Sequence, residues 1–279
     1  MDKNLEKSLK TTALKIRIGI LEELKNLGFG HVGGSLSVAD ALAVLYSTQM
    51  KFDPKNPKMP DRDKLICSKG HAGPAVYSTL AHFGFFPEEM LKTLNAEHTL
   101  LPSHCDRTKT PGVDMTTGSL GQGTSLACGM ALGDKLLGYT NRVFLIVGDG
   151  EANEGQVWEA FEFAAAKKLD NLVVLLDVNG KQLDGPTKEI LDPKDYTKKM
   201  EAFGFDTQTI DGNNVKELYK ALEKTRKADG KPFAIIMNTI KGKGVKAVEE
   251  TASNHSMNKP FEQWKEWQDQ LIKELGEEE

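Results

Sequence analysis

Two polar residues at the ends of predicted strands carry the most specific chemistry in the sequence. Asp149 follows the apolar run Val143 to Val147, and Asn179 follows a second run from Leu172 to Val178. Both runs have the length and the β-branched composition of buried strands. Between them, apolar residues recur at helical spacing, namely Val157, Ala160, Phe161 and Ala164. The stretch therefore predicts a strand, a helix and a second, parallel strand.

This βαβ unit would bring a carboxylate and an amide oxygen together. Right-handed crossover places the two strands side by side, about 4.8 Å apart, so Asp149 and Asn179 would emerge from the same carboxyl edge. Magnesium and calcium prefer oxygen ligands, and magnesium takes most of them from water and phosphates. Gly148 and Gly150 are expected to let the backbone turn sharply before a helix whose free amides face an anion. The pair suits a metal diphosphate, with loop Gly180 to Gly185 closing the rim.

Two other interpretations of the Gly148-Asp149-Gly150 triplet stay open at this point. Glycine and aspartate are frequent in βα turns for conformational reasons alone. The metal loop of haloacid-dehalogenase phosphatases also contains the triplet. Those enzymes, however, need a strand that ends in a nucleophilic DxD motif near the start of the chain, and no such strand is found. The asparagine about thirty residues after the aspartate also argues against a phosphatase.

Four of the six histidines fall in polar or glycine-bearing loops: His31, His71, His104 and His255. A single loop histidine is most often only exposed to solvent. Four imidazoles around one metal diphosphate, in contrast, suit a substrate with several hydroxyl groups whose protons move near neutral pH. His82, on a predicted helix, and His98 match no motif. The set of four therefore predicts sugar chemistry.

Composition and charge argue against several classes of protein. The chain has 279 residues and a net charge of −4, so nothing favours binding to nucleic acid or to an anionic membrane surface. No run of eighteen apolar residues is present, and the first residues lack the apolar core of a signal peptide, which predicts a cytoplasmic protein. The cysteines are odd in number and have no CxxC spacing, so we expect reduced thiols rather than disulfides or a zinc site.

The remaining elements predict one α/β domain over residues 1–279, with a doubly wound, mostly parallel sheet and helices on both faces. An amphipathic helix covers Leu5 to Leu27, and Ser37 with Asp40 forms a capping-box signature that opens a second helix through Tyr46. Further helices are expected around residues 73–83, 87–94, 196–203 and 215–227, and after Pro260. Strands are expected over residues 64–67, 206–210 and 233–239, with an irregular segment at 98–115.

A glycine turn from Gly118 to Gly123 leads into another helix. Its small residues permit close approach of the backbone to a ligand or to a neighbouring helix, and it lacks the GxGxxG spacing of a dinucleotide loop. We expect the chain to associate through this face, where Ala127, Met130 and Ala131 would leave an apolar packing surface. Burial of these residues within the domain itself is the alternative.

The motifs that contain these residues resemble the N-terminal part of transketolase. They follow one another in the order and approximate spacing of that family: GHVGGSLS, SKGHA, PSHCDRTKTPGVDMTTGSLGQG, GDGEANEG, LDVN with its trailing DG, and a loop histidine near the end. The sequence departs from the family at GSLGQG, where the family's GPLGQG has the same glycines. The resemblance spans nearly the whole chain, and the motifs together are highly specific although each alone is weak.

The resemblance implies a thiamine diphosphate enzyme and assigns a role to individual residues. Asp149 and Asn179 would hold Mg²⁺ (or Ca²⁺), and the backbone carbonyl of Lys181 would complete the protein ligands. The residues expected on the diphosphate side are His71, Gly150, Asn179 and His255. Those expected to border the aminopyrimidine are Gly118, Ser119 and Leu120. The residues expected to bind sugar hydroxyls and assist proton transfer are His31, His104 and His255.

The same resemblance implies that the active site is incomplete in this chain. A full transketolase continues with a pyrimidine-binding domain, which supplies the glutamate that activates the aminopyrimidine, and with a C-terminal domain. We therefore expect the N-terminal subunit of a split transketolase, assembled as α2β2 with a C-terminal subunit that carries the pyrimidine-binding domain. The reaction implied is transfer of a two-carbon ketol unit from a ketose phosphate to an aldose phosphate. Glu154 matches a family position at a subunit contact, although a glutamate at a helix start explains it as well.

Two other functions stay open. The α subunit of a 2-oxoacid dehydrogenase and deoxyxylulose-phosphate synthase share the GDG unit, and the histidine loops are the feature that distinguishes transketolase from both. A cofactor-binding homologue without catalysis is the non-enzyme alternative. Retention of all four loop histidines argues against it, because binding alone would need fewer of them.

Overall fold

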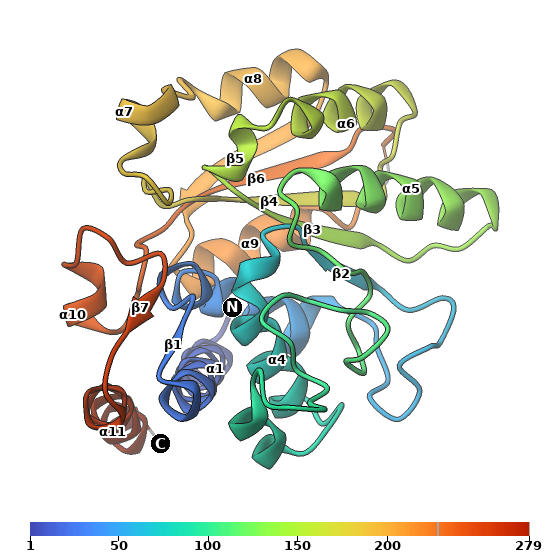
Figure 1. Ribbon diagram of the computed structural model, residues 1–279. Coiled ribbons are helices and arrows are strands. Elements are labelled where there is room, and N and C mark those ends of the chain that lie inside the picture. The colour runs from blue at the N-terminus through green and yellow to red at the C-terminus, as the bar shows by residue number, and fades with distance from the viewer. Residues whose placement is uncertain (228, 279) are drawn as a thin grey trace.

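Five parallel strands form the central sheet of the computed structural model, which describes residues 1–227 and 229–278 (Figure 1). Their order across the sheet is β2 (Lys64–Cys67), β3 (Val143–Gly148), β4 (Leu172–Val178), β6 (Phe233–Asn238) and β5 (Asp206–Asp211). β3 and β4 are adjacent, with Val143 opposite Leu172 and Gly148 opposite Asp177. The predicted strand-helix-strand unit and the predicted parallel sheet are therefore confirmed.

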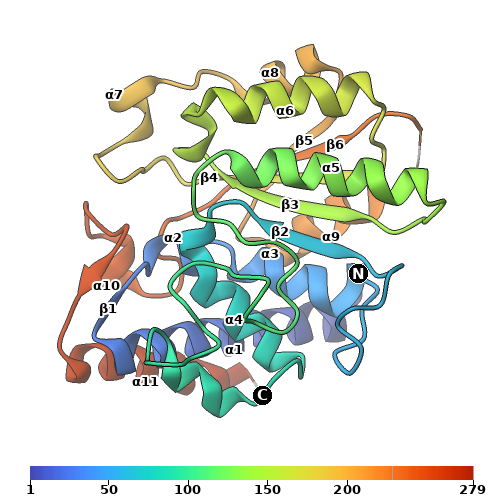
Figure 2. The same cartoon turned by 45° about the vertical axis from the view of Figure 1, so that its right-hand side comes forward.

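Helices cover both faces of the sheet, as Figures 1 and 2 show. One face carries α5 (Gln122–Leu136), α6 (Gly155–Ala166) and α8 (Tyr196–Phe203). On the other side lie α3 (Ala39–Val44), α4 (Gly73–His82) and α9 (Val215–Lys224), with α1 (Lys3–Leu27) packed against them and α11 (Phe261–Glu278) packed against α1. Phe144 and Ile146 of β3 belong to the core shared with α1, α3, α4 and α9, whereas Leu145 and Val147 belong to the core shared with α5, α6 and α8. Because both faces are buried, the central strands are continuously apolar.

Shorter elements connect these layers. They are α2 (Gly33–Leu36), the π-helical turn η1 (Leu45–Gln49), the 3₁₀ turns η2 (Gly70–Ala72), η3 (Glu88–Thr93) and η4 (Glu151–Asn153), α7 (Thr187–Leu191) and α10 (Lys246–Glu249). Two further strands, β1 (Phe29–Gly30) and β7 (Met257–Asn258), pair antiparallel outside the main sheet. This pairing joins segments from opposite ends of the sequence and was not among the predicted elements.

The predicted capping box is wrong. α3 begins at Ala39, two residues after Ser37, and the Ser37 hydroxyl donates to the carbonyl of Gly34 and to the carboxylate of Asp177 instead of accepting from a helix amide. Asp40 forms a buried ion pair with Arg17, at 2.5 Å. Ser37 and Asp40, which the local pattern assigned to a helix cap, therefore interact with residues far away in the sequence instead.

Two predicted helices differ in length or type. The segment at residues 87–94 forms the 3₁₀ turn η3, and α9 ends at Lys224 rather than at residue 227. The amphipathic helix near the start is confirmed as α1. It begins after Asp2, whose carboxylate accepts from the amide of Leu5, and it ends at Gly28, which has a positive φ of 77°.

The face of α5 that was predicted for association is only partly exposed. Ala127 and Ala131 are fully buried against the sheet and α6, so they are core residues and that part of the prediction is wrong. The outward side of the helix holds Gly129, around which a Cβ atom would meet nothing, and Leu136 and Leu137, which are 79% and 69% exposed. The outward side also exposes the polar residues Gln122, Ser125 and Lys135, and the predicted Met130 is half-buried, so association through this face remains a prediction.

Within the described ranges, no helix combines the length and the apolarity that a membrane crossing requires. The cysteines Cys67, Cys105 and Cys128 are free and buried. Burial raises the pKa of all three thiols. Their role in the structure is packing.

Candidate functional site

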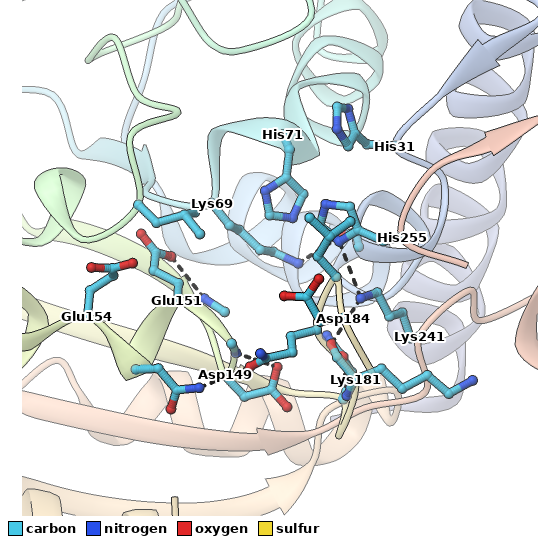
Figure 3. Close-up of a pocket in the computed structure, with 18 of the residues that line it drawn as sticks. His31, Lys69, His71, Asp149, Glu151, Glu154, Lys181, Asp184, Lys241 and His255 are labelled. Carbon is cyan, nitrogen blue, oxygen red and sulfur yellow. Dashed lines mark hydrogen bonds between the residues drawn. The ribbon is translucent and has the colours of Figure 1, made fainter. Parts of the chain in front are cut away.

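A cleft of about 500 Å³ opens at the carboxyl edge of β3 and β4 (Figure 3). Asp149 follows β3 and Asn179 follows β4, and both line the cleft, as the parallel pairing of these strands predicted. All four loop histidines lie around the same cleft. The side chains that the sequence placed in separate motifs are therefore gathered at one site.

The carboxylate of Asp149 is 2% exposed and is held by three donors. One oxygen accepts from the amide of Gly150 at 2.9 Å. The other accepts from the amide of Gly180 at 2.7 Å and from the hydroxyl of Thr187 at 3.1 Å. Burial, with the nearby charge of Asp177, raises the pKa of Asp149 to about 6. A cation bound at this carboxylate would favour its ionised form.

The predicted reason for the two glycines around Asp149 is corrected by the backbone. Gly150 has φ −65°, an ordinary helical value, so no left-handed turn is needed there. A Cβ on Gly150 would instead lie 2.7 Å from the Cβ of Gln182, so glycine permits the close approach of the loop at Gly180 to Gly185. The 3₁₀ turn η4 separates the turn of Gly148 to Gly150 from α6, which begins only at Gly155, so the free amides of α6 do not follow this turn directly as predicted.

Three oxygen atoms of this edge suit a hard cation. They are the Asp149 carboxylate, the Asn179 side-chain oxygen, which accepts from the amide of Lys181 at 3.2 Å, and the Lys181 carbonyl. The Lys181 carbonyl accepts from the ammonium of Lys241 at 2.9 Å, so this oxygen already faces a positive charge. No cluster of three or more acidic, histidine or cysteine side chains that could hold a metal occurs in residues 1–227 and 229–278. With one carboxylate among its donors, this set leaves coordination positions for water and phosphate oxygens, and a metal here remains a prediction.

A buried ion pair behind the cleft was missed by the sequence analysis. Lys69 and Asp177 are 1% and 0% exposed, and the ammonium lies 2.7 Å from the carboxylate. Asp177 also accepts from Ser37, Asn179 and Thr239, and Lys69 donates to the carbonyl of Gly34 at 2.6 Å. The signal was an aspartate inside the apolar run LVVLLDVN, because a buried strand tolerates a charge only with a partner.

His31 lies at the centre of the four histidines. Its ring centroid is 5.5 Å from those of His71 and His104 and 5.4 Å from that of His255. His71 and His255 are 4.6 Å apart, and Figure 3 shows their rings facing the cleft beside His31. The predicted convergence of the loop histidines is thus found. Their individual roles remain predictions.

The small β1–β7 pairing explains how distant histidines meet. His31 directly follows β1, and His255 precedes β7 by one residue. The amide of Gly33 donates to the carbonyl of Asn254 at 3.1 Å, and the Asn254 side chain donates to the carbonyl of Lys241 at 3.0 Å. These contacts hold the two histidine loops and Lys241 together at the rim.

The histidine cluster is electrostatically neutral near pH 7. Burial lowers the pKa of His31 and His104, and burial with the charge of Lys69 lowers that of His71 well below its ordinary value. Burial and Lys241 lower the pKa of His255 to about 4, while burial lowers that of Lys241 to about 8. Uncharged imidazoles can accept protons from a hydroxylated substrate.

The glycine turn before α5 forms the opposite wall. Gly118 and Leu120 line the cleft, whereas Ser119 is exposed and does not contribute to the lining. Gly118 has φ 148°, and a Cβ there would lie 3.0 Å from the ring of His104. Glycine is therefore required for the histidine to approach. Glu154 lines the cleft as an exposed residue at the start of α6, and its contact with another subunit remains a prediction.

The parallel sheet, the oxygen pair at its carboxyl edge and the adjoining glycine turn define the class of thiamine diphosphate-binding α/β domains. Residues 8–271 match the family described as the transketolase, thiamine diphosphate binding domain. The chain belongs to the transketolase family, as an N-terminal subunit of this thiamine diphosphate-dependent transferase. A 2-oxoacid dehydrogenase subunit, a deoxyxylulose-phosphate synthase and a non-catalytic homologue are not favoured.

Relatives of two architectures match the chain. The 6-deoxy-6-sulfo-D-fructose transketolase subunit SqwG of Clostridium sp. (strain MSTE9) is 50% identical over 95% of this chain and 97% of its own length. One subunit of the apulose-4-phosphate transketolase of Actinobacillus succinogenes is 40% identical over 88% of this chain and 87% of its own length. The solved transketolase of Campylobacter jejuni has a TM-score of 0.88 at 30% identity, over 99% of this chain and 43% of that enzyme. The chain thus spans nearly all of the subunit-type relatives and less than half of the long ones.

Proposed function

We propose that this chain contributes the metal, diphosphate and sugar-hydroxyl contacts of a two-subunit transketolase. The observation that carries the proposal is the convergence of four neutral histidines beside the Asp149 and Asn179 oxygens in one cleft. Asp149, Asn179 and the Lys181 carbonyl would hold Mg²⁺ (or Ca²⁺), which binds the diphosphate. When bound, thiamine diphosphate supplies the nucleophilic carbon and the electron sink for a two-carbon unit.

In this proposal the residues of the chain bind the sugar and move its protons. His31, His104 and His255 hold the hydroxyl groups of the ketose. A neutral ring nitrogen accepts the proton of the hydroxyl next to the carbon–carbon bond that breaks, and it returns the proton when the acceptor aldehyde is joined. Lys241 adds positive charge at the diphosphate side, where a polyanion must be balanced, whereas the charge of Lys69 is balanced by Asp177.

The partner in this proposal is a C-terminal subunit that carries the pyrimidine-binding domain, in an α2β2 assembly in the cytoplasm. Two relatives of similar length are themselves described as transketolase subunits, which supports a second polypeptide. Their stated substrates carry a sulfonate or a phosphate, which supports sugar phosphates, or sugars with another terminal anion, as substrates here. The apolar rim residues Leu183, Ile190 and Leu191, which are 46% to 64% exposed, offer a surface for that domain.

The test is purification of the protein from its source, identification of the copurifying polypeptide and reconstitution of the two. We expect ketol transfer from a ketose phosphate only when both subunits, thiamine diphosphate and Mg²⁺ are present. Robust turnover by the rigorously purified chain alone would disprove the two-subunit proposal. A reconstituted complex that binds thiamine diphosphate but transfers no ketol unit from any ketose would disprove the transketolase activity.

A further inference from the structure

Glu151 is a buried carboxylate that joins three segments around the cleft. It is 3% exposed and opens the 3₁₀ turn η4, directly after the turn that holds Asp149. One of its oxygens accepts from the hydroxyl of Ser68 at 2.5 Å and from the amide of Gly121 at 2.9 Å. The other accepts from the amide of Gly148 at 3.1 Å. Both carboxylate oxygens are therefore used, and each faces a different wall of the cleft.

The segment that Glu151 holds on one side is the turn before α5. Gly121 has a positive φ of 83° and stands at the N-cap of α5, where no side chain of the helix itself caps the amides. Its amide belongs to the first turn, which a helix leaves without internal partners. A carboxylate at this end also compensates the positive end of the helix dipole. Glu151 thus acts as a cap supplied from another part of the chain.

On its inner side, the turn before α5 is confined by close steric contacts. A Cβ on Gly123 would lie 2.6 Å from the Cβ of Ser68, and a Cβ on Gly70 would lie 2.5 Å from the carbonyl carbon of Thr117. Backbone therefore packs on backbone where the turn meets the end of β2. With the steric contact on one side and the Glu151 carboxylate on the other, the position of Gly118 and Leu120 in the cleft is determined.

We propose that Glu151 is a positioning residue, which fixes the turn of Gly118 to Gly121 relative to the metal-side turn of Gly148 to Gly150. The inference rests on the proposed function, in which the first turn borders the aminopyrimidine and the second leads into the metal ligand Asp149. The two turns would contact opposite ends of one cofactor molecule, so the distance between the turns must match the length of the cofactor. A single carboxylate hydrogen-bonded to both turns sets that separation before the cofactor binds.

Two features distinguish Glu151 from an ordinary buried ion pair. In the described part of the chain it forms no salt bridge with a lysine or arginine: three hydrogen-bond donors hold its carboxylate, and Lys69 adds a favourable charge interaction at longer range. Burial raises the pKa of Glu151, and its hydrogen bonds from Ser68, Gly121 and Gly148 oppose this effect. The two turns therefore stabilise the ionised Glu151 side chain, and the side chain in turn holds the two turns in place.

The test compares Glu151→Gln with Asp63→Asn. Glutamine has the same shape but only one acceptor oxygen, so its NH₂ group must face a backbone donor on one side. Asp63 is a buried-carboxylate control: it is 5% exposed, accepts from the amides of Lys51 and Arg142 at the opposite, amino end of β2, and differs from Glu151 in lying 3.9 Å from the Arg142 guanidinium. We expect hydrogen exchange of residues 117–124 in the isolated chain to be faster in Glu151→Gln and unchanged in Asp63→Asn.

The second measurement is titration of the complex of this chain and its copurified partner with thiamine diphosphate and Mg²⁺. We expect Glu151→Gln to raise the Kd roughly ten- to a hundredfold, as for loss of a charged hydrogen bond, and Asp63→Asn to leave it unchanged. Unchanged exchange, or faster exchange with unchanged Kd, overturns the inference while the proposed function stands. Absence of thiamine diphosphate binding by the parent complex overturns both.

Discussion

Replacing Lys69 by methionine tests whether the buried ion pair behind the cleft stabilises the fold. The substitution removes the ammonium 2.7 Å from Asp177 and keeps an unbranched side chain that is one atom shorter. Asp177 is 0% exposed, so solvent does not replace the lost charge. Removing one partner of a buried pair costs about 3–5 kcal/mol, because the other charge is left uncompensated. Ser37, Asn179 and Thr239 still donate to Asp177, so we expect a loss of about 3 kcal/mol, the lower end of this range.

Urea unfolding at pH 7 measures this loss as a lower free energy of unfolding. Lys246→Met is the matched control, since Lys246 and Glu250 are 85% and 67% exposed and lie 3.7 Å apart. Exposed pairs contribute at most about 1 kcal/mol. Asp177→Asn in the Lys69→Met background should recover part of the loss, because it removes the orphaned charge. If Lys69→Met and Lys246→Met unfold within about 1 kcal/mol of each other, the assigned energetic role of the buried pair is wrong.

The same variant has a defined dependence on pH. Burial raises the pKa of Asp177, but the ammonium of Lys69 and the hydrogen bonds outweigh it, so the pKa is lowered from its ordinary value. A lowered carboxyl pKa contributes stability above the unfolded value, which is about 3.9, and loses it as the pH falls through the folded value. The difference in unfolding free energy between the parent and Lys69→Met should therefore be at its full value at pH 7 and become smaller below about pH 4. A difference that grows in acid would contradict this account.

Three further predictions concern single side chains. Glu23 is fully buried in α1 and has no hydrogen-bond partner among the described residues, and burial raises its pKa. Its contribution to stability is therefore fully present below about pH 4.5, where the carboxyl group is neutral, and is lost as the pH rises through the pKa of the folded state. Glu23→Leu should therefore raise the unfolding free energy at pH 8 by about 1–3 kcal/mol and by less at pH 4, and an equal gain at both would disprove it. Asp149→Ala should abolish Mg²⁺-dependent thiamine diphosphate binding by the assembled enzyme, and Asn179→Ala should weaken this binding. If the Asp149→Ala enzyme still binds thiamine diphosphate tightly, the turn of Gly148 to Gly150 has only a structural role. His31→Ala should leave cofactor affinity intact while ketol transfer falls on the order of a hundredfold, and a matching loss of affinity would contradict a role at the sugar.

The sequence was sufficient where a periodic pattern or an ordered motif carried the information. The apolar runs before Asp149 and Asn179 predicted neighbouring parallel strands, and the four loop histidines predicted one cluster. It was insufficient where the partner of a side chain lies far along the chain. Ser37 matched a local capping pattern, yet its hydroxyl bonds to Asp177, more than a hundred residues later. Local patterns hold no information on which of two competing partners a buried polar group finds.

The roles of Lys69, Lys241 and Glu151 were missed for the same physical reason. Lysines and glutamates are mostly exposed in proteins, so their presence in SKGHA, KGKG or GDGE predicts nothing about burial. Each becomes informative only when the fold supplies its counterpart, as β4 does for Lys69 and the α5 turn does for Glu151. The two-residue strands β1 and β7 are likewise too short for any periodicity to predict them.

The β1–β7 pairing also has a consequence for biosynthesis. His31 emerges from the ribosome among the first residues, but His255 and β7 lie near the end of the chain, as does α11, which packs against α1. A nascent chain can form the early strands and helices, yet the wall that holds His31 does not exist until translation is almost complete. Until then the side of α1 that packs against α11 has no partner. The cleft is consequently a late product of synthesis, and a chain that stops before His255 lacks one of its walls.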